Sequence, residues 1–90
     1  MSEPEARPTE PDDGQDADEI VDARGLSCPM PVLELAKAID RIEVGTRVRL
    51  LATDPTAKVD VPIWCRMQRQ RLHAQDLDDN VWRFEVERVR

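Results

Sequence analysis

The residue best placed for chemistry is Cys28, one of two cysteines in the chain. It precedes an amphipathic helix pattern, and Pro29 and Pro31 follow it on either side of Met30. If Cys28 is the N-cap, the prolines occupy the first and third helical positions, where they rigidify the turn and bring no N–H donors. We expect the remaining N–H groups of Met30 and Val32 to lie near the Cys28 sulfur.

A helix N-terminus favours a thiolate because it carries a partial positive charge. The dipole contributes up to about 2 kcal/mol, and one pKa unit corresponds to about 1.36 kcal/mol. We therefore expect the pKa of Cys28 to fall from about 8.5 to roughly 7–8, which suits sulfur exchange. The alternative is that Cys28 is a small, inert, apolar residue that happens to precede a helix. Spacing and capping alone leave both interpretations open.

The second cysteine, Cys65, lies in a later helix pattern beside Trp64 and Met67. A core-facing thiol is the favoured interpretation, with a resolving or accessory sulfur role as the alternative. His73 is the sole histidine and falls on the charged side of a strand pattern, so we interpret it as an exposed residue. Cys28, Cys65 and His73 match no usual zinc spacing, and no second cysteine makes Cys28 part of a thioredoxin-type dithiol. We expect no metal and no organic cofactor.

The elements that must position these residues follow the order β-α-β-α-β-β. Because Pro62 would break a continuous helix, we expect a short turn before the second main helix. Asp54, followed by Pro55, is the expected N-cap of that turn, and Asp60, with Pro62, nearly repeats the same signal at the start of the helix. The expected ranges are a strand at 19–25, a helix at 29–41, a strand at 44–54, a turn at 55–59, a helix at 60–70 and a hairpin at 71–89 that turns at "LDDN".

The strand patterns alternate apolar and charged residues, which indicates one buried and one wet sheet face. Both helices must then cover the same face. The prediction is a two-layer α/β sandwich with a mixed four-stranded sheet: the first β-α-β unit is parallel, and the last two strands are antiparallel. In the expected hairpin, Leu72 and Ala74 share one face and alternate with Arg71, His73 and Gln75.

Residues 1–18 differ in composition from the rest of the chain. They hold three of the seven prolines, seven acidic residues and one basic residue, which predicts a disordered acidic tail before a folded domain at 19–90. The domain carries twelve acidic and twelve basic residues, so the net charge of −6 belongs to the tail. No apolar run reaches the ~18 residues of a membrane span, and no signal peptide begins the chain. We expect a soluble cytoplasmic protein, in a compartment where thiols stay reduced.

Arginines on the expected open sheet face and near the second helix raise the question of RNA binding. Because the domain is neutral and Glu85 and Glu87 share the face of Arg83, a solvated mixed-charge surface is favoured. The alternative is that arginines beside Cys28 contact an acidic or RNA-bearing partner. The arginines concerned are Arg47, Arg49, Arg66, Arg69, Arg71 and Arg83.

"LSCPMP" is a Cys-Pro-x-Pro motif that follows a first strand ending in Asp-x-x-Gly-Leu. Here the sequence resembles the TusA/SirA family of small sulfur-carrier proteins. "VDARGLSCPMPVLELAKAI", "VGTRVRLLATDP" and "DVPIWC" fall in the family's order and at its spacing, and the resemblance covers residues 20–89. One departure is that many members have Gly-His where this chain has Arg69 and Gln70, which changes the surface beyond the second helix.

The resemblance implies a βαβαββ two-layer fold and a persulfide carried on the motif cysteine, here Cys28. It implies a sulfur donor protein, such as a cysteine desulfurase or rhodanese, and a downstream acceptor protein. Pathways known in the family include tRNA thiolation, molybdenum cofactor synthesis and sulfur oxidation. We expect a free monomer with no membrane contact and no direct nucleic-acid binding. The alternative is a regulatory or RNA/protein-interaction module of the same fold without obligatory sulfur chemistry.

Overall fold

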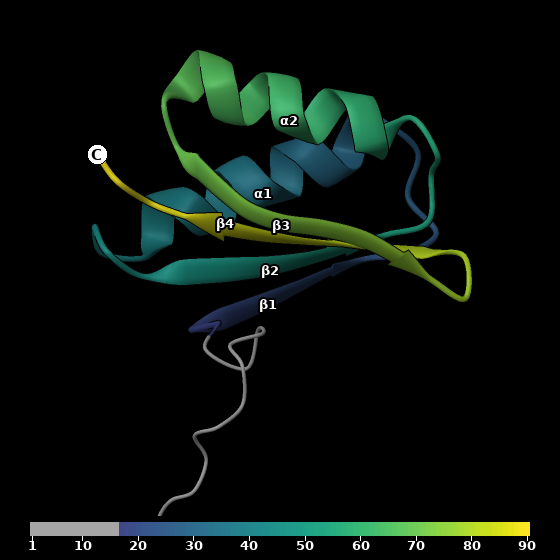
Figure 1. Cartoon of the computed structure of the whole chain (residues 1–90), viewed down its shortest axis with the longest axis horizontal. Helices are drawn as coiled ribbons and strands as arrows, with labels where there is room; N and C mark the ends of the chain where they lie inside the picture. The colour runs from purple at the N-terminus through teal and green to yellow at the C-terminus, as the bar shows by residue number, and fades with distance from the viewer. Residues whose placement is uncertain (1–16) are drawn as a thin grey trace, which may run out of the picture.

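The computed structural model describes residues 17–90 and has the expected element order, βαβαββ (Figure 1). Two helices and four strands make up the fold, and the strands form a single sheet. The elements are β1 (Glu19–Ala23), α1 (Met30–Arg41), β2 (Arg47–Ala52), α2 (Ala57–Gln68), β3 (Arg71–Asp78) and β4 (Val81–Glu87).

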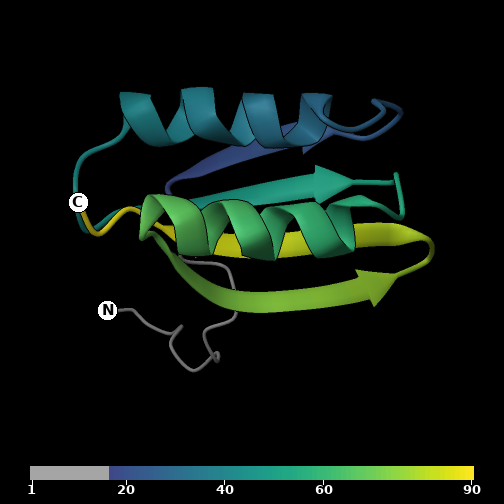
Figure 2. The ribbon, with the colours of Figure 1, turned by 90° about the horizontal axis from the view of Figure 1, so that it is seen from above.

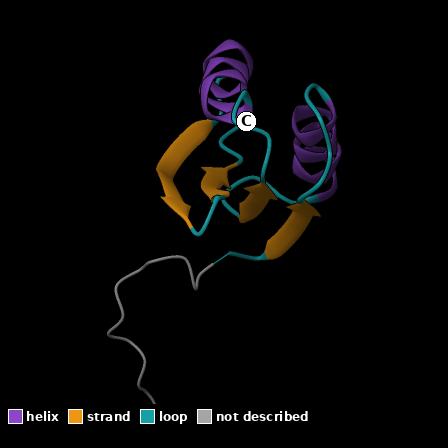
Figure 3. Ribbon diagram, turned by 90° about the vertical axis from the view of Figure 1, so that its right-hand side faces the viewer, coloured by secondary structure: helices purple, strands orange, loops and turns teal. Residues whose placement is uncertain are grey.

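The sheet is mixed, with the strand order β1-β2-β4-β3. β1 and β2 are parallel, whereas β4 is antiparallel to both β2 and β3. Figure 2 shows α1 above the β1–β2 half of the sheet and α2 above the β3–β4 half. Both helices lie on the same side of the sheet, as the end-on view in Figure 3 shows. The predicted two-layer α/β sandwich is confirmed.

The core lies between the sheet and the helices, and the strand register aligns its apolar residues in rows. Val21 of β1 pairs with Leu50 of β2, which pairs with Phe84 of β4. Because side chains alternate between the two faces of a strand, this register places every second residue under the helices. The helices contribute Leu35, Ala38, Ile39, Ala57, Val61 and Cys65 to the same core.

The expected break before Pro62 is wrong, since α2 runs without interruption from Ala57 to Gln68. A proline inside a helix cannot donate to the carbonyl four residues earlier, which here belongs to Lys58. The side-chain amide of Gln75, on β3, donates to that Lys58 oxygen at 3.3 Å. The neighbouring strand therefore supplies the donor that Pro62 lacks, and the helix continues through the proline.

The β3–β4 hairpin differs from its expected alternation. A register shift between Leu72 and Ala74 leaves His73 without a regular partner in the ladder, so Ala74 opposes Glu85 and Gln75 opposes the buried Phe84. Because a β-bulge of this kind adds one residue to the strand, the side chains after it point to the opposite sheet faces from those that regular alternation predicts. The prediction that Leu72 and Ala74 share a face is therefore wrong, and the flip is what directs Gln75 toward α2.

The turn of this hairpin lies at "LDDN", as predicted. Asp79 and Asn80 both adopt positive φ angles, of 55° and 66°. A two-residue hairpin turn with positive φ at both central positions matches the right-handed twist of the strands, and Asn and Asp tolerate this conformation better than most residues.

The folded part of the chain includes Asp18, one residue before β1. Its N–H donates to the carbonyl of Arg47 at 2.8 Å, and its Oδ2 accepts from the Arg47 N–H at 3.0 Å. Residues 1–16 of the predicted acidic tail lie outside the described residues. Across residues 17–90, no helix has the length and hydropathy needed to span a membrane.

Candidate functional site at Cys28

Cys28 lies in the loop that joins β1 to α1. Because β1 and β2 are adjacent and parallel, the loops that follow them emerge at the same edge of the sheet, where open α/β sheets commonly bind ligands. Cys28 is half-buried and packs against the edge of the core. Both loops and the first turns of both helices therefore contribute to its surroundings.

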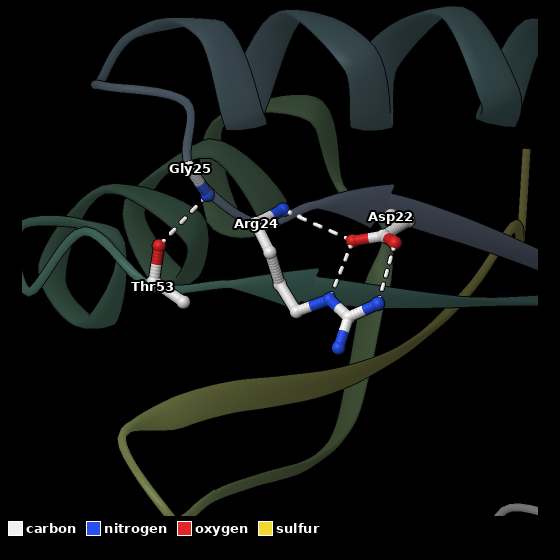
Figure 4. Close-up of polar contacts among 4 residues, drawn as sticks. All are labelled: Asp22, Arg24, Gly25 and Thr53. Carbon is white, nitrogen blue, oxygen red and sulfur yellow. Dashed lines mark hydrogen bonds and ion pairs between the residues drawn. The ribbon is translucent and has the colours of Figure 1, made fainter.

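Two contacts fix the chain just before Cys28, as Figure 4 shows. The Arg24 guanidinium donates to both carboxylate oxygens of Asp22, at 2.8 and 2.7 Å, and its hydrogen bonds lower the pKa of Asp22 to about 2. The Gly25 N–H donates to Thr53 Oγ1 at 2.9 Å, which joins this loop to the one after β2. Gly25 has a φ angle of +85°, a conformation that glycine adopts without strain.

Asp54, in the loop after β2, links the Cys28 loop to the start of α2. Its Oδ2 accepts from the Cys28 N–H at 2.8 Å, and its Oδ1 accepts from the Thr56 N–H at 2.9 Å. These backbone N–H groups lower the pKa of the Asp54 carboxyl, so it stays charged beside Cys28. Thr56, rather than Asp54, is the N-cap residue of α2, although Asp54 satisfies a donor of that first turn.

The predicted role of Cys28 as N-cap of α1 is wrong, because the helix begins at Met30 and its N-cap is Pro29. Pro31 is buried at the second helical position, and Val32 packs against the core. The Met30 N–H donates to the carbonyl of Ser27 at 2.8 Å. It therefore closes a turn with Ser27, rather than serving the sulfur as predicted.

The electrostatic surroundings of the thiol are also opposite to those predicted. Burial, a hydrogen bond to Asp60 of α2 and the negative charges of Asp54 and Asp60 together raise the pKa of Cys28 to about 11. The predicted fall to roughly 7–8 is wrong. It considered the α1 dipole alone and left out burial, which is the largest cause, and the negative charges of Asp54 and Asp60, each of which disfavours a second negative charge.

Cys65 faces the core from α2, with 3% of its surface exposed, as the favoured interpretation expected. Burial alone raises its pKa to about 11. Both cysteines are free thiols in the structure. Any accessory sulfur role for Cys65 would therefore require the end of α2 to open first.

The remaining candidates are paired on the sheet surface. His73 contacts Glu87 with 2.6 Å between Nε2 and Oε1, and the described part of the chain contains no cluster of metal-binding residues. On the sheet face away from the helices, Arg49 Nε pairs with the buried Glu85 at 2.6 Å, and Arg83 pairs with the exposed Asp76 at 2.6 Å. This is a mixed-charge surface, and the charges that act on Cys28 come from aspartates rather than arginines.

The sequence gave Asp54 and Asp60 only capping roles, and their effect on Cys28 was missed. A usable signal was present: "TDPTAKVD" directly follows the second strand, and the loops after two adjacent parallel strands meet at one sheet edge. That rule would have brought Thr53 and Asp54 to the Cys28 loop. Asp60 needs one further step, because its place depends on the helical turn that begins at Ala57.

The protein is a small two-layer α/β sandwich. Its candidate reactive residue, Cys28, lies in the loop at the carboxyl end of β1, beside the loop that follows β2. The sequence model of the TusA sulfurtransferase family matches residues 19–88. The chain belongs to the TusA sulfurtransferase family, whose members include sulfur carriers.

The curated relatives are named as sulfur carriers, and this chain matches nearly their whole length. A "Putative sulfur carrier protein" of Archaeoglobus fulgidus is 32% identical over 71 residues, which are 79% of this chain and 97% of the relative. The "Putative sulfur carrier protein YrkI" of Bacillus subtilis is 32% identical over 72 residues, which are 80% of this chain and 96% of the relative. The crystal structure of a SirA-like protein from Desulfitobacterium hafniense shares the fold, with a TM-score of 0.70, 20% identity and coverage of 80% and 99% of the two chains.

Proposed function

We propose that this protein is a sulfur carrier that accepts a sulfane sulfur as a persulfide on Cys28 and passes it to a downstream acceptor. Family membership supports the class of activity. The observation that supports the residue is exposure: Cys28 lies in an edge loop and is half-buried, whereas Cys65 is 3% exposed within the core. A carrier thiol has to be reached by the cysteines of two other proteins, which favours Cys28.

The loading step is an exchange between thiols. The Cys28 thiol loses its proton, and its sulfur attacks the outer sulfur of a persulfide on the donor protein. The donor's S–S bond breaks, the donor cysteine leaves as a thiolate, and that thiolate takes up a proton. Unloading repeats the step with the Cys28 persulfide as donor. Neither step needs an oxidant, a reductant or a cofactor.

The surface around Cys28 fits a protein partner. Leu26 and Met30 flank the cysteine in the chain and are 38% and 40% exposed. Apolar side chains of this kind on either side of a reactive residue suit a transient contact. We propose a cysteine desulfurase or rhodanese as the donor and a second sulfur-relay protein as the acceptor, in a reducing compartment such as the cytoplasm. The relay would lead to tRNA thiolation, molybdenum cofactor synthesis or sulfur oxidation.

Intact-mass spectrometry after incubation with a cysteine desulfurase and cysteine tests the proposal. The wild-type protein and Cys65→Ser should each gain the mass of one sulfur atom, and reduction should remove it. Cys28→Ser, which preserves the size of the side chain, should gain nothing. If wild type stays unloaded by both desulfurase and rhodanese donors, the interaction-module alternative would be the better account. Loading of Cys28→Ser would show that the carrier residue is not Cys28.

A further inference from the structure

The positive charges at the end of α2 differ from the others in the described part of the chain. Most basic side chains of residues 17–90 have a carboxylate, a carbonyl oxygen or an aromatic ring beside them; these are Arg24, Lys37, Arg41, Arg47, Arg49, Lys58, Arg71, Arg83 and Arg88. The guanidinium groups of Arg66, Arg69 and Arg90 are exposed and make no hydrogen bond or ion pair with any residue of that range. The positive charge that lacks a partner within residues 17–90 therefore collects at one end of α2.

A surface hollow of about 580 Å³ lies at this end of α2, and it is lined by Met67, Gln68, Arg69, Gln70 and Arg90. Arg66 is adjacent, since its carbonyl accepts from the Arg69 N–H at 3.2 Å. Arg69 itself has a left-handed backbone, with φ 60° and ψ 36°, which side chains disfavour. It adopts this conformation without a side-chain contact in residues 17–90 that offsets it. Such a departure from local preference is typical of a binding residue.

The described chain begins at this same end of the sheet. Asp18 is bonded to Arg47 at the start of β2. Arg47 pairs with Glu87 of β4, which in turn pairs with Arg71 at the start of β3, three residues after the end of α2. Figure 2 shows the end of α2 and the C-terminus on this side of the molecule. Three strand spacings, or roughly 15 Å, separate Asp18 from Arg71, whereas the residues before Ala17 span up to about 50 Å when extended.

The N-terminal segment has the charge that the arginines lack: residues 1–16 hold six acidic residues and one basic residue. We propose that residues 1–16 bind back onto the end of α2, with their carboxylates against Arg66, Arg69 and Arg90, and thereby cover this surface from other acidic chains. The connection through the chain gives the segment an effective concentration in the millimolar range. Cys28 lies at the opposite edge of the sheet, so the contact is independent of the proposed sulfur chemistry.

The arginine surface fits carboxylates better than single-stranded nucleic acid. Proteins that bind single-stranded RNA or DNA stack its bases on exposed aromatic side chains. In residues 17–90 the aromatic side chains are Trp64 and Trp82, which are half-buried against the core, and Phe84, which is fully buried. The exposed apolar side chain at the hollow is instead Met67, which is 72% exposed. An acidic peptide segment needs no stacking partner, and residues 1–16 are such a segment.

A full-length variant with a neutral N-terminal segment tests the contact. Every acidic residue of the segment becomes its amide: Glu3→Gln, Glu5→Gln, Glu10→Gln, Asp12→Asn, Asp13→Asn and Asp16→Asn. In ¹H–¹⁵N correlation spectra at low salt, wild type and this neutral-segment variant should differ at the backbone amides of residues 66–70 and at the Nε–H groups of Arg66 and Arg69. Added salt should move the wild-type signals to the positions of the variant, because salt screens exposed charges. Identical signals at low salt, or differences confined to Arg49 and Arg83 on the sheet face, would overturn the proposal.

A fluorescein-labelled peptide of residues 2–16 measures the same contact by competition. Fluorescence anisotropy should show that it binds the neutral-segment variant about fivefold or more tightly than wild type, whose own segment occupies the surface. Arg66→Gln and Arg69→Gln, each added to the neutral-segment variant, should weaken peptide binding about threefold or more. Lys37→Gln is the matched control. It removes the same charge from the exposed face of α1 and should change the affinity less than about 1.5-fold.

Far-UV circular dichroism checks that each variant folds. Equal peptide affinities of wild type and the neutral-segment variant, or equal effects of Arg69→Gln and Lys37→Gln, would show that residues 1–16 do not occupy the end of α2. The spectra are also recorded over a range of protein concentrations. A difference between wild type and the neutral-segment variant that is independent of concentration supports binding within one chain. A difference that grows with concentration would mean that the segment binds a second copy, and the proposed contact within the chain would be wrong.

Discussion

The two cysteines have the same raised pKa for different reasons. Burial alone raises the pKa of Cys65 to about 11. At Cys28 burial is joined by a hydrogen bond to Asp60 and by the charges of Asp54 and Asp60, and together they raise the pKa to about 11 as well. The part of the shift that comes from charges can be cancelled by a counter-charge, whereas the part that comes from burial is removed only by exposing the thiol.

This difference follows from where each thiol lies. Cys65 packs under α2 against the sheet, and burial is the sole cause of the raised pKa of its thiol. Cys28 lies in a loop whose backbone is held by Asp54, so a change of charge there need not disturb the core. Equal pKa values therefore describe one thiol that lies half-buried in a loop and one that the core encloses.

The largest expected effect is on alkylation by iodoacetamide. At pH 8.5 Cys28 should react from the folded state, whereas Cys65 should react only when α2 opens. If that opening costs about 4–5 kcal/mol, close to the global stability of a small domain, it protects Cys65 about a thousandfold. The opened Cys65 has the ordinary thiol pKa of 9.0, whereas the pKa of Cys28 is about 11, so Cys65 should react about tenfold to sixtyfold more slowly than Cys28. Peptide mapping over time measures both rates. In denaturing urea the two should converge, and a native Cys65 rate equal to the Cys28 rate would show that Cys65 is not protected.

The pattern of burial that separates the two thiols could be predicted in part. The helical spacing of α2 places Ala57, Val61 and Cys65 on one face, which local periodicity can reveal. Local periodicity could not predict the surroundings of Cys28, because Cys28 and Asp60 are distant in sequence. Their proximity depends on the parallel pairing of β1 with β2.

The errors in the predicted fold also come from contacts between segments that are distant in sequence. The register shift beside His73 and the unbroken helix through Pro62 are connected, because the shifted strand brings Gln75 to the Lys58 carbonyl. Each feature contradicts a local rule when it is taken alone. The compensating contact joins two elements, so no pattern within either segment reveals it. Alternation and turn residues nevertheless sufficed for the element order and the layers.

The next expected effect is a loss of stability between pH 9 and 11. A thiol whose pKa is raised by folding binds its proton more tightly in the folded state, so its contribution is fully present below the unfolded pKa and is lost as pH rises through the folded pKa. For Cys65 a rise from 9.0 to about 11 corresponds to at most about 3 kcal/mol. Urea unfolding at pH 8 and pH 11 should show a smaller loss in Cys65→Ala than in wild type. An equal loss would mean that folding does not raise the pKa of Cys65.

Serine substitutions should separate the two sites by stability. Cys65→Ser places a hydroxyl in the core and should lower the free energy of unfolding by about 1–3 kcal/mol. Cys28→Ser, in the half-buried loop, should cost less than about 1 kcal/mol. Urea midpoints at pH 7 measure both, and Cys65→Ala distinguishes the buried hydroxyl from the lost sulfur volume. If Cys28→Ser were the more destabilising variant, the loop would contribute more to the fold than its exposure indicates.

The smallest expected effect concerns the end of α2, next to Cys65. Arg69 is the C-cap and has a left-handed conformation, with φ 60° and ψ 36°, and the following Gln70 N–H donates to the Cys65 carbonyl at 2.9 Å. A side chain in this conformation costs roughly 1–2 kcal/mol, part of which glycine gives back as unfolded-state entropy. Arg69→Gly should therefore stabilise the protein by about 0.5–1 kcal/mol.

Because Arg69→Gly strengthens the end of the helix that covers Cys65, it should slow Cys65 alkylation by about two- to fivefold and leave the Cys28 rate unchanged. Arg66→Gly is the matched control: it removes the same side chain three residues earlier, where glycine weakens a helix by about 1 kcal/mol, and should accelerate Cys65 alkylation instead. If both variants shift Cys65 in the same direction, Arg69 carries no backbone strain. If either shifts Cys28, the two thiols are coupled, and the separation between the loop thiol and the core thiol fails.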